Sequence, residues 1–201
     1  MFMQQLLFLL RQPGLVLLMG LTGGFWSGIS QAGSNLDINL TASIVNSTCK
    51  LSLENGGEVY LPNVTRAWFY NNDGSSKYAP TDEAGGTPFN VRLEDCADNS
   101  SIKQLMFSFT PQSGFWSNQN QVFKNDATTG AAQNVGIVIF SADYKTNVLN
   151  SDGSSNVVYD VSGKSSSLYL TDYQFYARYQ NTGAVVSGVV TSNVLVDVSY
   201  E

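Results

Sequence analysis

The sequence of 201 residues predicts an all-β protein built as a sandwich. Three observations support this prediction. Apolar residues alternate with polar ones over short segments, as they do in strands that bury one face. Turn-forming residues separate these segments, and no convincing helical pattern interrupts them. Charged residues make up only 13% of the chain, which contains 18 Gly and many Ser, Thr and Asn, a composition typical of strands and turns.

Each predicted strand ends at a turn signal. Pro62 stops the predicted strand at 59–61, and residues 71–87, with three Gly and one Pro, form a long predicted loop. Asp152-Gly153 and Asn181-Thr182-Gly183 supply further turns. Seven or eight short strands with turns between them predict a single immunoglobulin-like domain. The predicted strands lie at residues 36–49, 59–61, 89–96, 104–110, 135–140, 157–161, 173–179 and 185–200, the last being interrupted near Gly188.

The segment 188–201 is the most informative strand. Its apolar residues share one parity and so predict one buried face, while polar residues line the other face. No returning strand follows it in the sequence. Two interpretations are open: earlier strands pair with it on both sides, or it presents an edge that accepts a strand from another chain. The residues of the buried parity are Val190, Val194, Val196, Val198 and Tyr200.

The amino-terminal segment predicts export. Residues 1–32 contain Arg11 as their only charge, an apolar stretch at 15–21, and small residues at Ser30 and Ala32. This pattern is typical of a signal peptide that is cleaved after Ala32. The alternative is a membrane anchor, but residues 12–14 divide the apolar stretch into pieces shorter than the roughly 20 residues that span a bilayer.

The two cysteines agree with export. Cys49 and Cys96 are the only cysteines, and in an exported chain they most simply form one disulfide. The chain has no His, which excludes a zinc site of the usual kind and a Cys/His catalytic pair. The net charge of −6, with scattered Lys and Arg, excludes a basic patch for nucleic acid. No motif for a nucleophile, a phosphate or a cofactor is present, so we predict neither an enzyme nor a cofactor.

Four segments in order resemble the major-type subunits of chaperone–usher fimbriae. They are Ile44-Val45-Asn46-Ser47-Thr48-Cys49, the segment 89–96 ending in Cys96, the segment 134–139, and Phe175-Tyr176-Ala177-Arg178-Tyr179. The sharpest resemblance is the terminal pattern, in which Gly188 stands fourteen positions from the end and Tyr200 is penultimate. The resemblance covers essentially the whole chain after residue 32.

The resemblance implies an immunoglobulin-like domain that lacks its final strand and is completed by a donor strand from another chain. It implies three partners: a periplasmic chaperone that fills the groove first, an outer-membrane usher, and neighbouring fimbrial subunits. The subunit would pass through the periplasm to a fimbrium at the cell surface and contribute to adhesion. When the family's terminal pattern is matched to this sequence residue by residue, the resemblance implies a groove strand that contains Gly188, Val190, Val194, Val196, Val198 and Tyr200.

The donor side is less regular. Residues 33–41 are the expected donor extension and residues 42–201 the pilin domain, with Leu36, Ile38 and Leu40 entering a neighbour's groove. The position where the family usually has a donor Gly corresponds here to Leu36, and the extension is short. The alternative is that these three residues form an ordinary first strand.

Other candidate residues have plainer explanations. Trp68-Phe69-Tyr70 and Phe115-Trp116 suit sugar stacking, but such residues more often anchor loops or fill a core. The adjacent carboxylates Asp82-Glu83 and Glu94-Asp95 are poorly placed as an acid/base pair, since neighbours on a strand point to opposite faces. The main functional alternative to a fimbrial subunit is therefore a stand-alone, secreted carbohydrate-binding sandwich. Within the fimbrial class, the sequence leaves shaft, adaptor and terminator roles open.

Overall fold

Two β-sheets and a shared apolar core make up the described part of the chain. The computed structural model describes residues 37–42, 49–96, 102–116 and 118–201. The predicted signal peptide, residues 1–32, and Leu36 lie outside the described residues. No helix among the described residues is long and apolar enough to cross a membrane.

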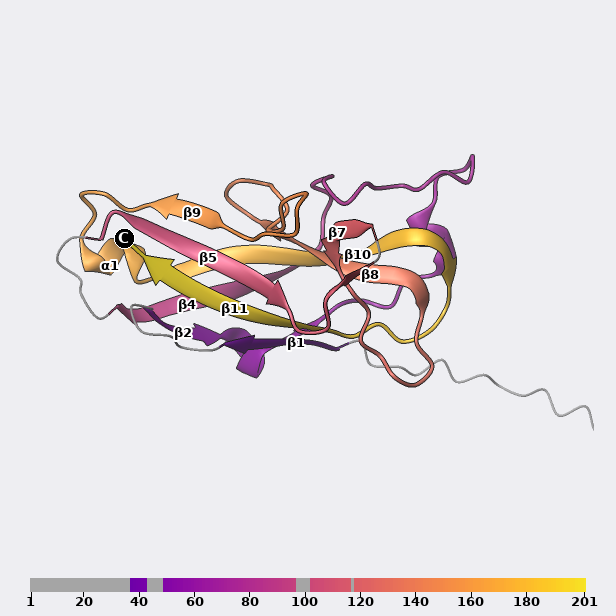
Figure 1. Ribbon diagram of the computed structural model, residues 1–201, viewed down its shortest axis with the longest axis horizontal. Helices are drawn as coiled ribbons and strands as arrows, with labels where there is room; N and C mark the ends of the chain where they lie inside the picture. The colour runs from indigo at the N-terminus through magenta and orange to yellow at the C-terminus, as the bar shows by residue number, and fades with distance from the viewer. Residues whose placement is uncertain (1–36, 43–48, 97–101, 117) are drawn as a thin grey trace, which may run out of the picture. The chain divides into compact units, whose positions relative to one another are not determined.

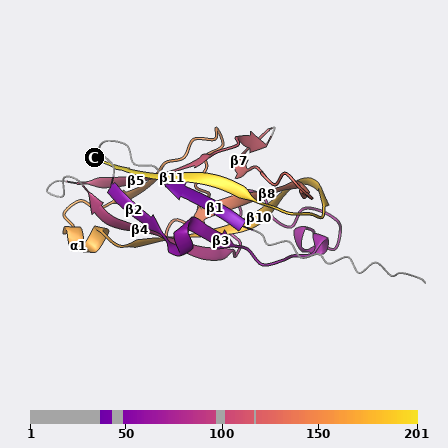
Figure 2. The same cartoon turned by 90° about the horizontal axis from the view of Figure 1, so that it is seen from below.

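The first sheet has five strands in the order β3-β1-β11-β5-β9, and the second has six in the order β2-β4-β10-β8-β7-β6. Figure 1 shows β5 and β11 side by side, and Figure 2 shows β1 beside β11 and near β3. The short helical segments are η1 (Glu54–Gly57), η2 (Arg66–Phe69) and α1 (Ser166–Tyr169). The strands are β1 (Asp37–Ala42), β2 (Cys49–Leu53), β3 (Glu58–Tyr60), β4 (Thr87–Cys96), β5 (Gln104–Pro111), β6 (Phe115–Trp116), β7 (Gln119–Phe123), β8 (Gln133–Ser141), β9 (Val157–Asp160), β10 (Asp172–Val186) and β11 (Ser192–Tyr200).

The core forms because alternate residues of facing strands point inward. On β5, Leu105, Phe107 and Phe109 are almost fully buried. Phe107 and Phe109 pack against Phe175 of β10, with ring centroids 5.6 and 4.9 Å apart. These aromatic contacts join the two sheets, because β5 belongs to the first sheet and β10 to the second. The all-β sandwich predicted from the alternating pattern is confirmed.

Strand β8 is buried on both faces over residues 135–141. Val138 and Phe140 point away from the main core but are 0% exposed, and they form a second apolar cluster with Val122. Phe140 stacks on Tyr176 of β10 at 5.3 Å between ring centroids. The uninterrupted apolar run in this strand fits burial on both faces, because a strand with one wet face alternates instead.

Two predicted boundaries were wrong. The predicted turn at Asn181-Thr182-Gly183 lies inside β10, where the register with β8 shifts between Asn181 and Val186. A bulge and a turn use the same residue types, so sequence alone did not separate them. The strand predicted from Gly188 onward begins only at Ser192, because residues 187–191 carry the chain from the second sheet to the first. Strands β6 and β7 were not predicted, since Gln119–Phe123 opens with polar residues that give no alternation.

Candidate functional site

The candidate site is a gap in the first sheet, between β3 and β11, that β1 occupies. We call it the strand slot. Strand β1 pairs with β11 in parallel and with β3 in antiparallel orientation. Neighbouring strands lie about 4.8 Å apart, so removing β1 would leave β3 and β11 about 10 Å apart with unpaired backbone groups on both sides. The slot is therefore a place where the fold depends on one added strand.

The β11 side of the slot has the buried face that the alternating pattern predicted. Val194, Val196 and Val198 are each 0% exposed. Their partners on β5 are Pro111, Phe109 and Phe107, respectively. Val190 is also buried, and Tyr200 is partly buried and packs against the core, but Val190 precedes β11. The terminal strand is thus paired on both sides in this structure, by β5 and by β1.

The amino-terminal strand pairs with β11 in phase with this buried face. Ile38 lies opposite Ser192, Leu40 opposite Val194, and Ala42 opposite Val196. The three β11 partners are all buried. The residues predicted to be donor positions, Ile38 and Leu40, therefore occupy the register positions opposite the buried parity of the terminal strand.

A tight turn positions β3 as the other wall of the slot. Asn55, Gly56 and Gly57 have φ values of 52°, 68° and 91°, all in the left-handed region. Glycine adopts this conformation without steric cost, which allows the chain to reverse within η1. Strand β3 follows directly and pairs with Asp37, Ile38 and Asn39 of β1. The turn thus moves the chain from β2 in the second sheet to β3 in the first.

An apolar pocket of about 270 Å³ lies next to the β3 end of the slot. Its lining includes Leu61, which follows β3 by one residue, and Trp68, Ala177 and Tyr179. Trp68 makes an edge-on contact with Tyr179, at 6.3 Å between ring centroids. Burial raises the pKa of Tyr179 well above its ordinary value, so this side chain remains a neutral wall. Leu61 directly follows Tyr60, which is the register partner of Asp37 at the start of β1.

A buried arginine fixes the loop that borders this pocket. Arg178 is 3% exposed, and its Nη2 donates to the carbonyl oxygens of Ala79 and Asp82 at 2.9 and 2.8 Å. Its guanidinium lies 5.0 Å from the ring centroid of Tyr78 and 5.3 Å from that of Phe140. Burial lowers the pKa of Arg178 from its ordinary value, while the carboxylate of Asp82 acts in the opposite direction. The long loop predicted at residues 71–87 is therefore held against the outer face of β10.

The start of β11 is fixed by residues that the sequence did not single out. Buried Asn125 donates from Nδ2 to the carbonyl of Val189 at 2.9 Å and accepts from the amide of Thr191 at 2.9 Å. Next to it, the Asp126 carboxylate accepts from the amide of Asn193 at 2.9 Å. Their position in a polar stretch between strands gave no signal, because their role depends on a crossover distant in sequence.

The backbone of Gly188 lies very close to the backbone of residues 130–132, outside the slot. A Cβ atom at this position would lie 2.4 Å from the Ala132 nitrogen and 2.4 Å from the Gly130 oxygen. Val189 then exchanges backbone hydrogen bonds with Gly130 and Ala132. The absence of a side chain at Gly188 thus lets residues 187–191, which cross from one sheet to the other, pass the loop before β8. Gly188 precedes β11 and is not part of the strand that lines the slot.

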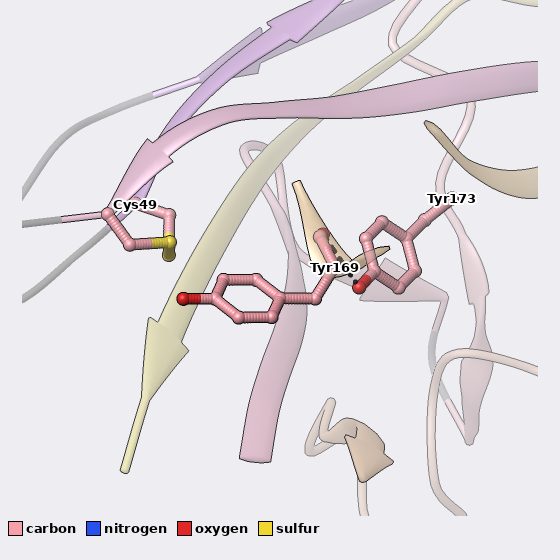
Figure 3. Close-up of a disulfide and its surroundings, with 4 residues drawn as sticks. Cys49, Tyr169 and Tyr173 are labelled. Atoms are coloured by element: carbon pink, nitrogen blue, oxygen red, sulfur yellow. Dashed lines mark hydrogen bonds between the residues drawn. A yellow bond between two sulfur atoms is a disulfide. The ribbon is translucent and has the colours of Figure 1, made fainter. Parts of the chain in front are cut away.

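A disulfide joins Cys49 and Cys96 at the ends of β2 and β4. Figure 3 shows the Tyr169 ring pointing toward this disulfide, and the Tyr173 hydroxyl donates to the Tyr169 carbonyl at 3.0 Å. Six residues, 43–48, separate Cys49 from the end of β1 in the sequence. The disulfide therefore anchors the chain just after the strand that fills the slot.

The aromatic residues and carboxylates that the sequence offered as other candidates take part in packing and in ion pairs. Phe69 is buried, while Trp68, Tyr70 and Phe115 pack against the main core, and Trp116 packs against the second cluster. Glu94 pairs with Lys50 at 2.6 Å, and Glu83 pairs with Lys145 at 3.3 Å. Among the described residues, no group of His, Cys, Asp or Glu is placed to hold a metal. The aromatic side chains thus serve packing, which weakens the carbohydrate-binding alternative.

Comparison with known proteins gives a consistent result. A sequence model of the family described as fimbrial protein matches residues 38–201. The chain is 36% identical over 175 residues to the fimbrial-like protein YadK of Escherichia coli K12, covering 82% of this chain and 85% of that protein. It is 30% identical to the probable major fimbrial subunit LpfA of Escherichia coli O157:H7, covering 82% and 83%. It is 28% identical to the minor fimbrial subunit HifD of Haemophilus influenzae, covering 78% and 69%.

Proposed function

The chain belongs to the fimbrial protein family, and we propose that this pilus subunit polymerises by donor-strand exchange within a chaperone–usher fimbria. Members of the family are structural subunits and not enzymes, and their place is the surface fimbrium. Neighbouring fimbrial subunits are accordingly its partners. The proposal adds the route of assembly, which passes through a periplasmic chaperone and an outer-membrane usher, and a contribution to cell adhesion.

The strand slot is the observation that carries the proposal. Its β11 wall presents Val194, Val196 and Val198, each fully buried. Burying one such side chain contributes about 1.5–3 kcal/mol, so a donor with matching apolar residues gains several kcal/mol in addition to a backbone ladder. Val190 and Tyr200 extend the same parity at either end of the strand. We assign this wall as the surface that a chaperone strand and then a neighbour's donor strand would contact.

The donor is the amino-terminal segment of another subunit. In this chain it corresponds to residues 33–41, with Leu36, Ile38 and Leu40 as the side chains that enter the neighbour's slot. The register of β1 supports this assignment, because Ile38 and Leu40 already lie opposite buried residues of β11. The pilin domain then comprises residues 42–201, and residues 1–32 act as the signal peptide that starts export.

A peptide-uptake experiment tests the proposal. The exported chain is incubated with a fluorescent peptide of its residues 33–42, and the complex is measured by gel filtration. The double substitution Val196→Asp and Val198→Asp should abolish uptake, and it should also abolish capture by a co-expressed chaperone. Leu195→Asp is the matched control, because Leu195 lies between them on the other face and is partly exposed. Equal uptake by the double variant and the control would exclude the slot as the docking site.

A second arm leaves the folded protein unchanged. Peptides carrying Leu40→Asp or Asn39→Asp are compared on the unaltered chain. The Leu40 change should weaken binding by at least tenfold, because Leu40 takes the register position opposite buried Val194, where burial of an apolar side chain would be worth about 1.5–3 kcal/mol. The Asn39 change should have little effect. If both peptides bound equally well, side-chain recognition in the slot would be refuted.

A further inference from the structure

The slot is filled by a strand of its own chain. We propose that β1 is a replaceable plug: the free subunit closes its own slot, stays folded and latent, and joins a polymer only after β1 leaves. The released strand then enters the slot of a second copy. This inference rests on the proposed function and adds a control of when the slot opens. The occupant is defined by the pairing of residues 38–42 with residues 192–196.

The direction of β1 follows from its tether. Cys49, which is bonded to Cys96, follows Ala42 after only six intervening residues. Figure 1 places the carboxyl end of β11 at the end of the sandwich where β4 finishes in Cys96. To reach Cys49 by so short a connection, β1 has to run toward that end, and it is therefore parallel to β11. A donor from another chain has no such tether and is free to enter in either direction.

The tether also favours the plug in a dilute solution of monomers. A short linker holds β1 near the slot at an effective concentration of the order of millimolar. An exported subunit encounters other copies at far lower concentration, so closure within one chain is kinetically preferred. Closure covers the unpaired edge, which would otherwise invite aggregation.

Only short runs of backbone pairing hold β1 against β11 and β3, which makes the plug replaceable. Its register with β11 spans five residue pairs, whereas β11 has nine residues. Its register with β3 spans three pairs. Parallel pairing is slightly less stable per residue than antiparallel pairing. A donor that continues past Val196, or that enters antiparallel, would gain pairs that the plug does not make.

A crosslink tests where β1 lies. Asn39 and Asn193 are register partners, so Asn39→Cys with Asn193→Cys in the full exported chain should form a disulfide on oxidation. The matched control is Asn39→Cys with Gln112→Cys. The Gln112 amide bonds to Asn193 from the β5 side, which places Gln112 one strand further from β1, beyond disulfide reach. Failure of the first pair to crosslink, or equal crosslinking of both, would overturn the inference.

The crosslink also tests whether the plug must leave. The oxidised Asn39/Asn193 variant should lose uptake of the peptide of residues 33–42, and brief mild reduction should restore it. The unaltered chain treated with the same reductant is the control for the Cys49–Cys96 disulfide. If the oxidised variant took up the peptide as fast as the reduced one, the plug would not control access and the inference would fall.

A weakened plug separates this inference from the proposed function. Leu40→Asp in the chain should speed uptake of the unaltered peptide at least tenfold, whereas Asn39→Asp should leave the rate within about twofold. If the unaltered and Leu40→Asp chains took up peptide at equal rates, exchange would occur but β1 would not limit it. If neither chain took up peptide although the Asn39/Asn193 crosslink formed, β1 would be a permanent strand, and both the exchange and the replaceable plug would be refuted.

Discussion

Truncating Val196 to alanine should destabilise the folded chain by about 2–3 kcal/mol. Val196 is 0% exposed and lies between Ala42 of β1 and Phe109 of β5. The substitution removes two buried carbon atoms, which costs about 1.6 kcal/mol in transfer free energy. The cavity that remains adds about 1 kcal/mol, since the flanking strands cannot close fully around it.

Urea denaturation of the exported, disulfide-bonded monomer measures this loss as a shift in midpoint at unchanged slope. Leu195→Ala is the control, because Leu195 is partly exposed on the other face of the same strand, and it should cost less than about 1 kcal/mol. A loss below about 1 kcal/mol for Val196→Ala, or a loss no larger than for Leu195→Ala, would refute the reasoning. Val196 would then not be part of a closed core in the free subunit.

Four further changes test other features. Replacing Cys49 and Cys96 with Ala should cost about 4 kcal/mol in unfolding free energy, because the disulfide closes a loop with a separation of 47 residues; an unchanged urea midpoint would contradict this. Gly188→Ala should cost at least about 2 kcal/mol or prevent accumulation of folded protein, since the new methyl group would meet rigid backbone at 2.4 Å; a normal yield and midpoint would show that the crossover can shift. Arg178→Met should cost about 1–3 kcal/mol, because the carbonyls of Ala79 and Asp82 lose the part-buried hydrogen bonds that Arg178 donates, and limited proteolysis should then cut first within residues 71–87. Asp197→Asn should raise the melting temperature at pH 7, with the gain disappearing below about pH 4.

The sign of the Asp197 prediction follows from proton linkage. Burial raises the pKa of Asp197 above its ordinary value of 3.8, and its Oδ1 atom has no hydrogen-bond partner. The folded chain therefore holds this proton more tightly than the unfolded chain does. Stability then falls as pH rises through the window between the unfolded and folded pKa values. The Asn variant has no such penalty, so a melting-temperature gain that persisted unchanged at low pH would exclude this cause.

The parts of the fold set by local patterning were predictable from sequence. Residues 89–94 alternate strictly, and β4 spans Thr87–Cys96 with Phe89, Val91 and Leu93 buried. The shared parity of Val194, Val196 and Val198 likewise predicted the buried face of β11. These predictions succeed because the side chains of a strand alternate between its two faces, whatever the strand pairs with.

Features set by long-range contacts were not predictable in the same way. Nothing local to Asn125 indicates that it brackets residues 189–191, which lie more than sixty positions further along the chain. Arg178 stands within a strand pattern, but its role depends on the loop carbonyls of Ala79 and Asp82. The strand that pairs with the terminal strand was likewise not predictable, because this pairing also depends on residues distant in sequence. The amino-terminal and carboxy-terminal segments both alternate in sequence, and only the register shows that they are in phase.

The occupied slot changes what the folding of a monomer can show. An incomplete subunit would be expected to aggregate when made alone, and unaided folding would then speak against polymerisation. In this chain β1 pairs with both walls of the slot, so a soluble monomer is compatible with a polymerising subunit. Folding alone therefore does not separate a pilus subunit from a stand-alone binding domain. Exchange does separate them, because a replaceable β1 gives way to a competing strand, whereas a permanent first strand does not.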